Sequence, residues 1–112
     1  MTKVVFFAFK NSPMCFQHLM LNAFDIIEKG GQAKIVFEGE AVKLPQALNE
    51  AGNPLFKKAL EEKVIDGVCE ACSKSMEVYE INKELGINFI SDMHGHPAMN
   101  TYLKEGFQVI IL

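Results

Sequence analysis

Short apolar stretches alternate with helical segments along the whole chain, and this alternation limits the folds available to it. The runs Val4–Phe9, Ala33–Phe37, Ile65–Cys69, Ile87–Ser91 and Phe107–Leu112 have the length and the apolar content of buried strands. Strands separated by helices favour a parallel sheet that is covered on both faces. We therefore predict an α/β fold, a three-layer α/β/α arrangement with a five-stranded, mainly parallel sheet.

The segments between these runs carry helix start and stop signals. Met14–Lys29 follows Ser12-Pro13, a capping residue and a proline suited to the first turn, and it ends at Gly30-Gly31. Further helices are predicted after Asn53-Pro54, around Met76–Leu85, and from Pro97 to Glu105.

Length, charge and hydropathy restrict the class of protein. The 112 residues fit one domain, residues 1–112, and a net charge of -3 leaves no basic surplus for binding nucleic acid. The longest apolar run, Val4–Phe9, is far shorter than the roughly 20 residues of a membrane span. We expect a cytoplasmic protein, in which three cysteines, an odd number, do not form a disulfide framework.

The reactive side chains follow the predicted strands. Because right-handed crossovers place every strand-to-helix loop at one edge of a parallel sheet, these side chains are expected to gather there. They are Cys15 after the first strand, Glu38 and Glu40 after the second, Cys69 and Cys72 after the third, and His94 and His96 after the fourth.

Cys69 and Cys72 form a Cys-x-x-Cys pair between a strand and a helix. Backbone N–H groups at such a turn favour the thiolate over the thiol, and Lys74 adds positive charge nearby. The alternative is that both are small packing residues, as free cysteines often are. Cys15, between Met14 and Phe16, is either a reactive thiol in a first helical turn or a buried, inert one.

The remaining polar candidates have alternative interpretations. His94 and His96 have a spacing common among metal ligands, and with Cys69 and Cys72 they would make a Cys₂His₂ set; otherwise one histidine helps to cap the following helix. Glu38 and Glu40 are either a carboxylate pair for acid–base work or two solvated loop residues. His18, on the polar stripe of the first helix, is expected to be exposed.

The chain resembles the DsrE/DsrF-like family, which includes the TusD-type sulfur-relay proteins. The resemblance rests on VVFFAF, the long first helix, IDGVCEACS and the closing HGHPAMNTYLKEGFQVIIL. It implies a three-layer, flavodoxin-like fold and a trimer or hexamer of identical chains. It also implies that Cys69, just after the third strand, accepts persulfide sulfur. Cys72 is additional to the relay pattern, and Cys72-Ser73-Lys74-Ser75 stands where relay members carry small residues and arginines.

Two functions follow as hypotheses. In the first, Cys69 accepts sulfur from a donor protein and passes it to an acceptor, with Cys72 as a resolving thiol, His94 or His96 as a proton donor and no cofactor. In the second, the chain is a non-catalytic metal- or ligand-binding module built on the cysteine and histidine loops.

Overall fold

Five parallel strands form one sheet in the computed structural model, which describes residues 1–112. Their order across the sheet is β4-β3-β2-β1-β5, so β1 and β2 lie at the centre with β3. The predicted α/β fold with a parallel sheet is therefore confirmed. The strands are β1 (Lys3–Ala8), β2 (Gln32–Phe37), β3 (Ile65–Cys69), β4 (Phe89–Ile90) and β5 (Gln108–Ile111).

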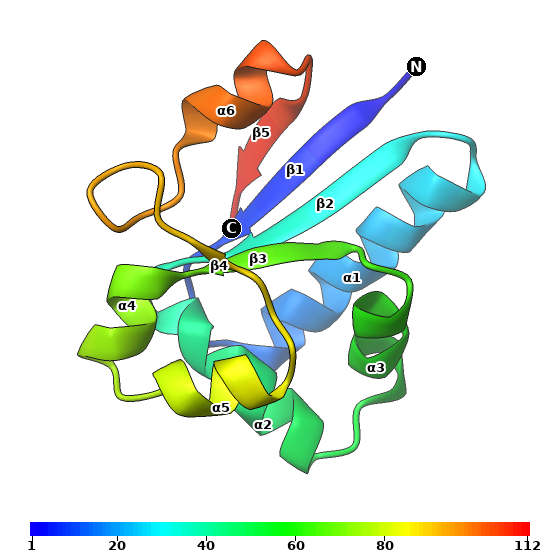
Figure 1. Ribbon diagram of the computed structural model, residues 1–112. Coiled ribbons are helices and arrows are strands. Elements are labelled where there is room, and N and C mark those ends of the chain that lie inside the picture. Colours follow the sequence, from blue (N-terminus) through cyan, green and yellow to red (C-terminus); the bar gives the residue numbers. More distant parts are fainter.

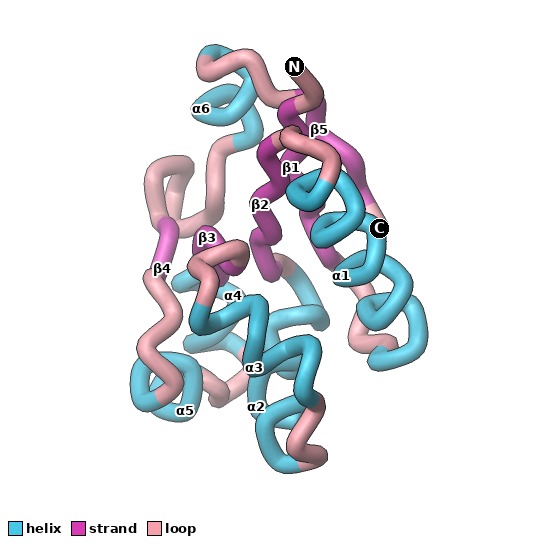
Figure 2. The backbone as a smooth tube through the Cα atoms, turned by 90° about the vertical axis from the view of Figure 1, so that its right-hand side faces the viewer, coloured by secondary structure: helices cyan, strands magenta, loops and turns pink.

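The helices are divided unequally between the two faces of the sheet (Figure 1). The steps β1→β2→β3→β4 all run in one direction, so right-handed crossovers place their helices on the same face. The return from β4 to β5 runs the other way, and α6 lies on the opposite face, as Figure 2 also shows. The helices are α1 (Pro13–Glu28), the 3-10 helix η1 (Gly39–Lys43), α2 (Leu44–Glu50), α3 (Pro54–Glu61), α4 (Glu70–Ser75), α5 (Tyr79–Glu84) and α6 (Met99–Lys104).

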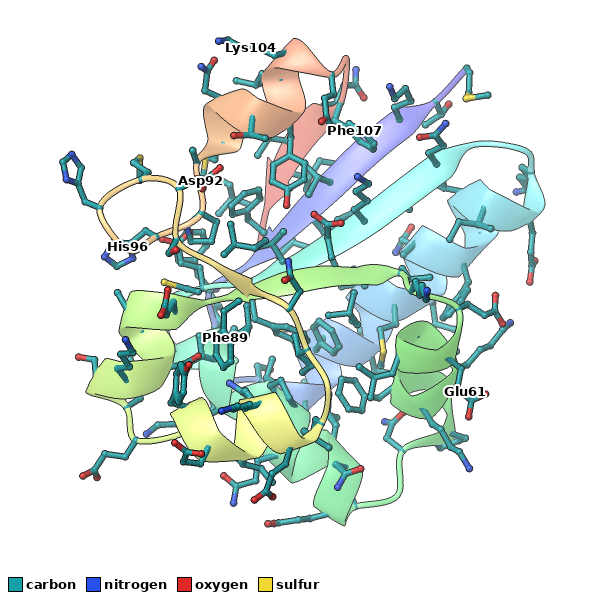
Figure 3. The ribbon with its side chains drawn as sticks, viewed as in Figure 1. Glu61, Phe89, Asp92, His96, Lys104 and Phe107 are labelled. Carbon is teal, nitrogen blue, oxygen red and sulfur yellow. The ribbon has the colours of Figure 1, made fainter.

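Alternating side chains of the central strands enter two separate cores, because successive residues of a strand face opposite sides. Val4, Phe6 and Ala8 of β1 point into the larger core, beneath α1 and the helices that follow it. Val5 and Phe7 point into a smaller core with Tyr102 and Phe107, the latter labelled in Figure 3. One short helix thus covers the second face.

Two predicted segments differ from the structure. The helix predicted around Met76–Leu85 begins only at Tyr79, as α5, because Glu77 adopts a left-handed conformation with φ of 59° after α4 ends at Ser75. The fourth strand is only Phe89–Ile90, shorter than Ile87–Ser91, because only these two residues pair with β3. No helix of the chain is both long enough and apolar enough to cross a membrane.

Gly67 permits the close pairing of β3 with β4. A Cβ atom at this position would lie 2.5 Å from Cδ1 and Cγ1 of Ile90 and 2.8 Å from the carbonyl oxygen of Asn88. Real Cβ atoms do not approach other atoms so closely. The strand that ends at Cys69 therefore requires glycine two residues earlier.

We expect Gly67→Ala to destabilise the protein by about 1–3 kcal/mol, because the new methyl group overpacks the contact between β3 and β4. Urea unfolding measures the change. In the double variant with Ile90→Ala the side-chain clash is removed, so the combined loss should be smaller than the sum of the single losses. Strictly additive losses would contradict this account.

Candidate functional site

Cys69 ends β3 and at the same time caps α4. Its Sγ accepts a hydrogen bond from the backbone N–H of Cys72 at 3.3 Å, the role that a serine or aspartate side chain usually has at a helix N-terminus. Its carbonyl oxygen accepts a hydrogen bond from the Ser73 hydroxyl at 2.7 Å. Both contacts fix the backbone between the two cysteines, so Cys72 is held one helical turn from Cys69.

The loop between β4 and α6 brings His96 to the cysteines. Met93 and His96 exchange backbone hydrogen bonds of 2.8 and 2.9 Å, and the two residues between them, His94 and Gly95, have φ of 50° and 88°. Two consecutive positive φ values are typical of a type I′ turn. The Gly95 carbonyl also accepts a hydrogen bond from Ala71 N–H at 3.0 Å, which ties the turn to α4.

The two histidines of this turn differ in exposure and in their distance from the cysteines. His94 is exposed at the tip, whereas His96 stands at the base, beside α4 (Figure 3). His96 Nδ1 lies 3.1 Å from Cys69 Sγ and 3.7 Å from Cys72 Sγ. The two sulfurs and one ring nitrogen of these three residues lie within 4.8 Å of one another. We call Cys69, Cys72 and His96 the thiol–imidazole cluster.

Glu38 approaches the cluster from the end of β2. Its carboxylate oxygen Oε2 lies 3.5 Å from His96 Nδ1, and its side chain is only 13% exposed. Burial raises the pKa of the Glu38 carboxyl, and the charge of His96 acts in the opposite direction. The expectation of two solvated glutamates is therefore wrong for Glu38, whereas Glu40 is exposed as expected. The two do not form a carboxylate pair, because Glu38 belongs to the site and Glu40 to the surface.

Burial has the largest influence on the pKa of the Cys69 thiol. It raises the pKa of this thiol to about 12, although the hydrogen bond from Cys72 N–H lowers it. The neighbouring Cys72 thiol and the Glu38 carboxylate raise the pKa further. The thiolate expected from the strand-to-helix turn is therefore not the ground state of Cys69, because lost hydration outweighs the N–H group.

Three other predicted residues lie outside the cluster. Cys15 is exposed in the first turn of α1, where its N–H donates to Ser12 Oγ. The Lys74 ammonium pairs with Glu70 at 3.2 Å and lies 5.3 Å from the centre of the Tyr79 ring. Its charge is therefore directed to these two side chains and not to the thiols. His18 is exposed, as predicted.

Sequence reasoning missed the support behind Cys69. Asn82 and Ser73 are fully buried, and Asn82 Nδ2 donates to Ser73 Oγ at 3.2 Å and to the Val42 carbonyl at 3.1 Å. Ser73 in turn donates to the Cys69 carbonyl, so α5 and the segment before α2 hold the cysteine turn in place. A polar residue within a helix gives no sequence signal of burial.

The chain is 38% identical to "Uncharacterized protein MJ0733" of Methanocaldococcus jannaschii over 119 aligned residues. The alignment covers 98% of this chain and 95% of that protein, so nearly the full length of both is matched. No family profile matches the sequence, and no solved structure matches it.

Thiol alkylation tests the burial of the site. We expect iodoacetamide to modify exposed Cys15 first, half-buried Cys72 next and Cys69 last, because Cys69 lacks both access and acidity. Peptide mass spectrometry over time near neutral pH measures the order. Equal rates for Cys69 and Cys15 in the folded protein would contradict it, and the denatured protein provides the control in which the rates converge.

Proposed function

This chain belongs to the same family as the Methanocaldococcus jannaschii protein, and we propose that it is a sulfur-handling protein of the DsrE-like type. The Cys69–Cys72 pair would accept persulfide sulfur from a donor protein and pass it to an acceptor protein. The observation that carries the proposal is the position of one imidazole nitrogen, 3.1 Å from one thiol and 3.7 Å from the other.

His96 is suited to take a proton from either thiol. A thiol becomes a nucleophile as its thiolate, and a neighbouring histidine is a common proton acceptor for this purpose. The imidazolium that results would face the Glu38 carboxylate, which lies 3.5 Å from Nδ1. The same nitrogen contacts both sulfurs, so it serves whichever thiol is reacting.

Access favours Cys72 as the first acceptor. The sequence hypothesis placed sulfur first on Cys69, but Cys69 is 0% exposed and Cys72 is half-buried. The Cys72 thiolate would attack the terminal sulfur of a donor persulfide, forming Cys72–S–SH and releasing the donor thiolate. An acceptor thiolate would then take the terminal sulfur in the same way and restore Cys72.

Cys69 would act as the second thiol beneath Cys72. Its thiolate, formed when His96 takes the proton, would attack the inner sulfur of the Cys72 persulfide. This forms the Cys69–Cys72 disulfide and releases hydrosulfide, and an external dithiol reduces the disulfide by two electrons. No cofactor is needed, and the cytoplasm is the compartment in which such thiols stay reduced.

Intact mass spectrometry after incubation with a persulfide donor tests the function. We expect the reduced protein to gain about 32 Da per sulfur, on a peptide that contains Cys72. Cys72→Ser should abolish the gain, Cys69→Ser should prolong the persulfide, and His96→Gln should slow its formation. Cys15→Ser, at the thiol outside the cluster, is the matched control and should behave as the parent does. Sulfur uptake by the Cys69→Ser, Cys72→Ser double variant at the parent rate would refute the proposal.

We also propose that the protein is a homo-oligomer, a trimer or hexamer as the family resemblance implies. The edge strand β5 supports this, because Ile111 is 57% exposed and Leu112, which follows it, is 46% exposed. Unprotected apolar edges favour association. We expect sedimentation at micromolar concentration to show a multiple of the 12.5 kDa chain. The Ile111→Lys variant should weaken the association between chains. A parent that is monomeric throughout would contradict the proposal.

A further inference from the structure

We propose that Cys69, Cys72, His96 and Glu38 together bind one thiophilic divalent cation of the zinc class. The thiol–imidazole cluster supplies three donor atoms, and Glu38 supplies the fourth from the neighbouring strand. The four side chains come from three consecutive connections, after β2, after β3 and after β4, at one edge of the sheet. The site stands independently of sulfur transfer, because binding of the metal is measured directly.

The spacing of the donor atoms fits tetrahedral coordination. Bonds of about 2.3 Å to sulfur and about 2.0 Å to nitrogen place those two ligand atoms roughly 3.5 Å apart around zinc. The distances from His96 Nδ1 to the two sulfurs, 3.1 and 3.7 Å, lie on either side of this value. The distance from Nδ1 to Glu38 Oε2 is 3.5 Å. The two sulfurs and Nδ1 lie within 4.8 Å of one another, and rotation of the Glu38 side chain would bring its carboxylate to the fourth position.

The donor chemistry selects the class of ion. Two sulfurs and an imidazole nitrogen are ligands that zinc prefers, whereas magnesium and calcium take sites of oxygen atoms. A carboxylate oxygen as the fourth ligand is also common for zinc and is unsuited to copper(I), which selects soft sulfur ligands. The set therefore fits zinc and its spectroscopic substitute cobalt(II).

The electrostatics of the site also favour a cation. Cys69, Cys72 and Glu38, three groups that are anionic when deprotonated, lie around one imidazole in a partly buried space. A bound dication would stabilise all three anions, because a coordinated thiol is deprotonated. The Cys72 N–H that points at Cys69 Sγ then stabilises a charged sulfur.

The backbone holds the ligands before any ion arrives. Cys69 is fixed as the cap of α4, and the hydrogen bond between Ala71 N–H and the Gly95 carbonyl fixes the histidine turn against it. His96 is 39% exposed and gives the ion a path from solvent. The Cys₂His₂ set that the sequence predicted includes His94. His94 is exposed at the tip of the turn and lies outside the cluster, so Glu38 takes its place in the proposed set.

Binding would have a direct consequence for the thiols. Both sulfurs would be occupied and their protons released, so the loaded protein would resist alkylation and would not accept sulfur until the ion left. Metal occupancy would thus be an inactive, protected state of the same pair.

Titration of the reduced, full-length protein with cobalt(II) tests the site. Displacement of the bound cobalt by zinc then measures the affinity for zinc. We expect one ion per chain, thiolate-to-cobalt charge-transfer absorption, visible bands of tetrahedral intensity, and proton release from both thiols. Cys69→Ser and Cys72→Ser should each lose much of the charge-transfer band. His96→Gln and Glu38→Ala should each weaken zinc binding by about 10-fold or more.

Two matched controls come from the same loops. His94→Gln and Glu40→Ala change exposed residues two positions away in the sequence, and both should bind zinc as the parent does. Zinc should protect Cys69 and Cys72 from iodoacetamide but leave Cys15 reactive.

Three results would overturn the assignment: no cobalt–thiolate band in the parent, equal losses for His94→Gln and His96→Gln, or parent-like affinity of Glu38→Ala. Zinc binding without any sulfur uptake would refute the sulfur-transfer proposal but not the metal site. Sulfur uptake without metal binding would refute the metal site but not sulfur transfer, so the two failures are distinguishable.

Discussion

The parallel pairing of β2, β3 and β4 is the constraint on which the rest of the site depends. Because these strands run in the same direction, their carboxyl ends lie together at one edge. Glu38 follows β2, Cys69 ends β3, and His96 is in the loop that follows β4. Gly67 permits the last of these pairings, since any larger residue would meet Ile90. A change in strand order or direction would separate the donor atoms.

Cys69 lies under two opposing influences. The N–H of Cys72 favours a charged sulfur, but burial and neighbouring negative charge oppose it more strongly. In the proposed sulfur transfer, a proton taken by His96 would relieve this opposition, and a bound dication would relieve it more completely. Both proposals thus depend on the same feature, a dithiol that needs a positive partner within reach to become reactive or to bind.

Rigid support distinguishes this site from cysteines that happen to be close. Ser73 donates to the Cys69 carbonyl and accepts from buried Asn82, and the turn from Met93 to His96 is fixed by backbone hydrogen bonds. These contacts keep the thiols and the imidazole at defined distances without a ligand. The exposed Cys15 has none of this surrounding structure beyond its helix cap, which is why it is suited to be a control rather than a functional thiol.

The sequence by itself indicated five strands in a parallel sheet and the edge at which Cys69, Cys72 and His96 meet, because hydrophobic periodicity and crossover handedness are local or general properties. It identified Cys69, Cys72 and His96 among the candidates. Only the tertiary structure decided that His96 and not His94 meets the thiols, because the positive φ angles of a single turn send the two in different directions. It also decided that Glu38 joins the site while Glu40 stays at the surface, and that the pKa of Cys69 is raised, because burial depends on packing between distant segments.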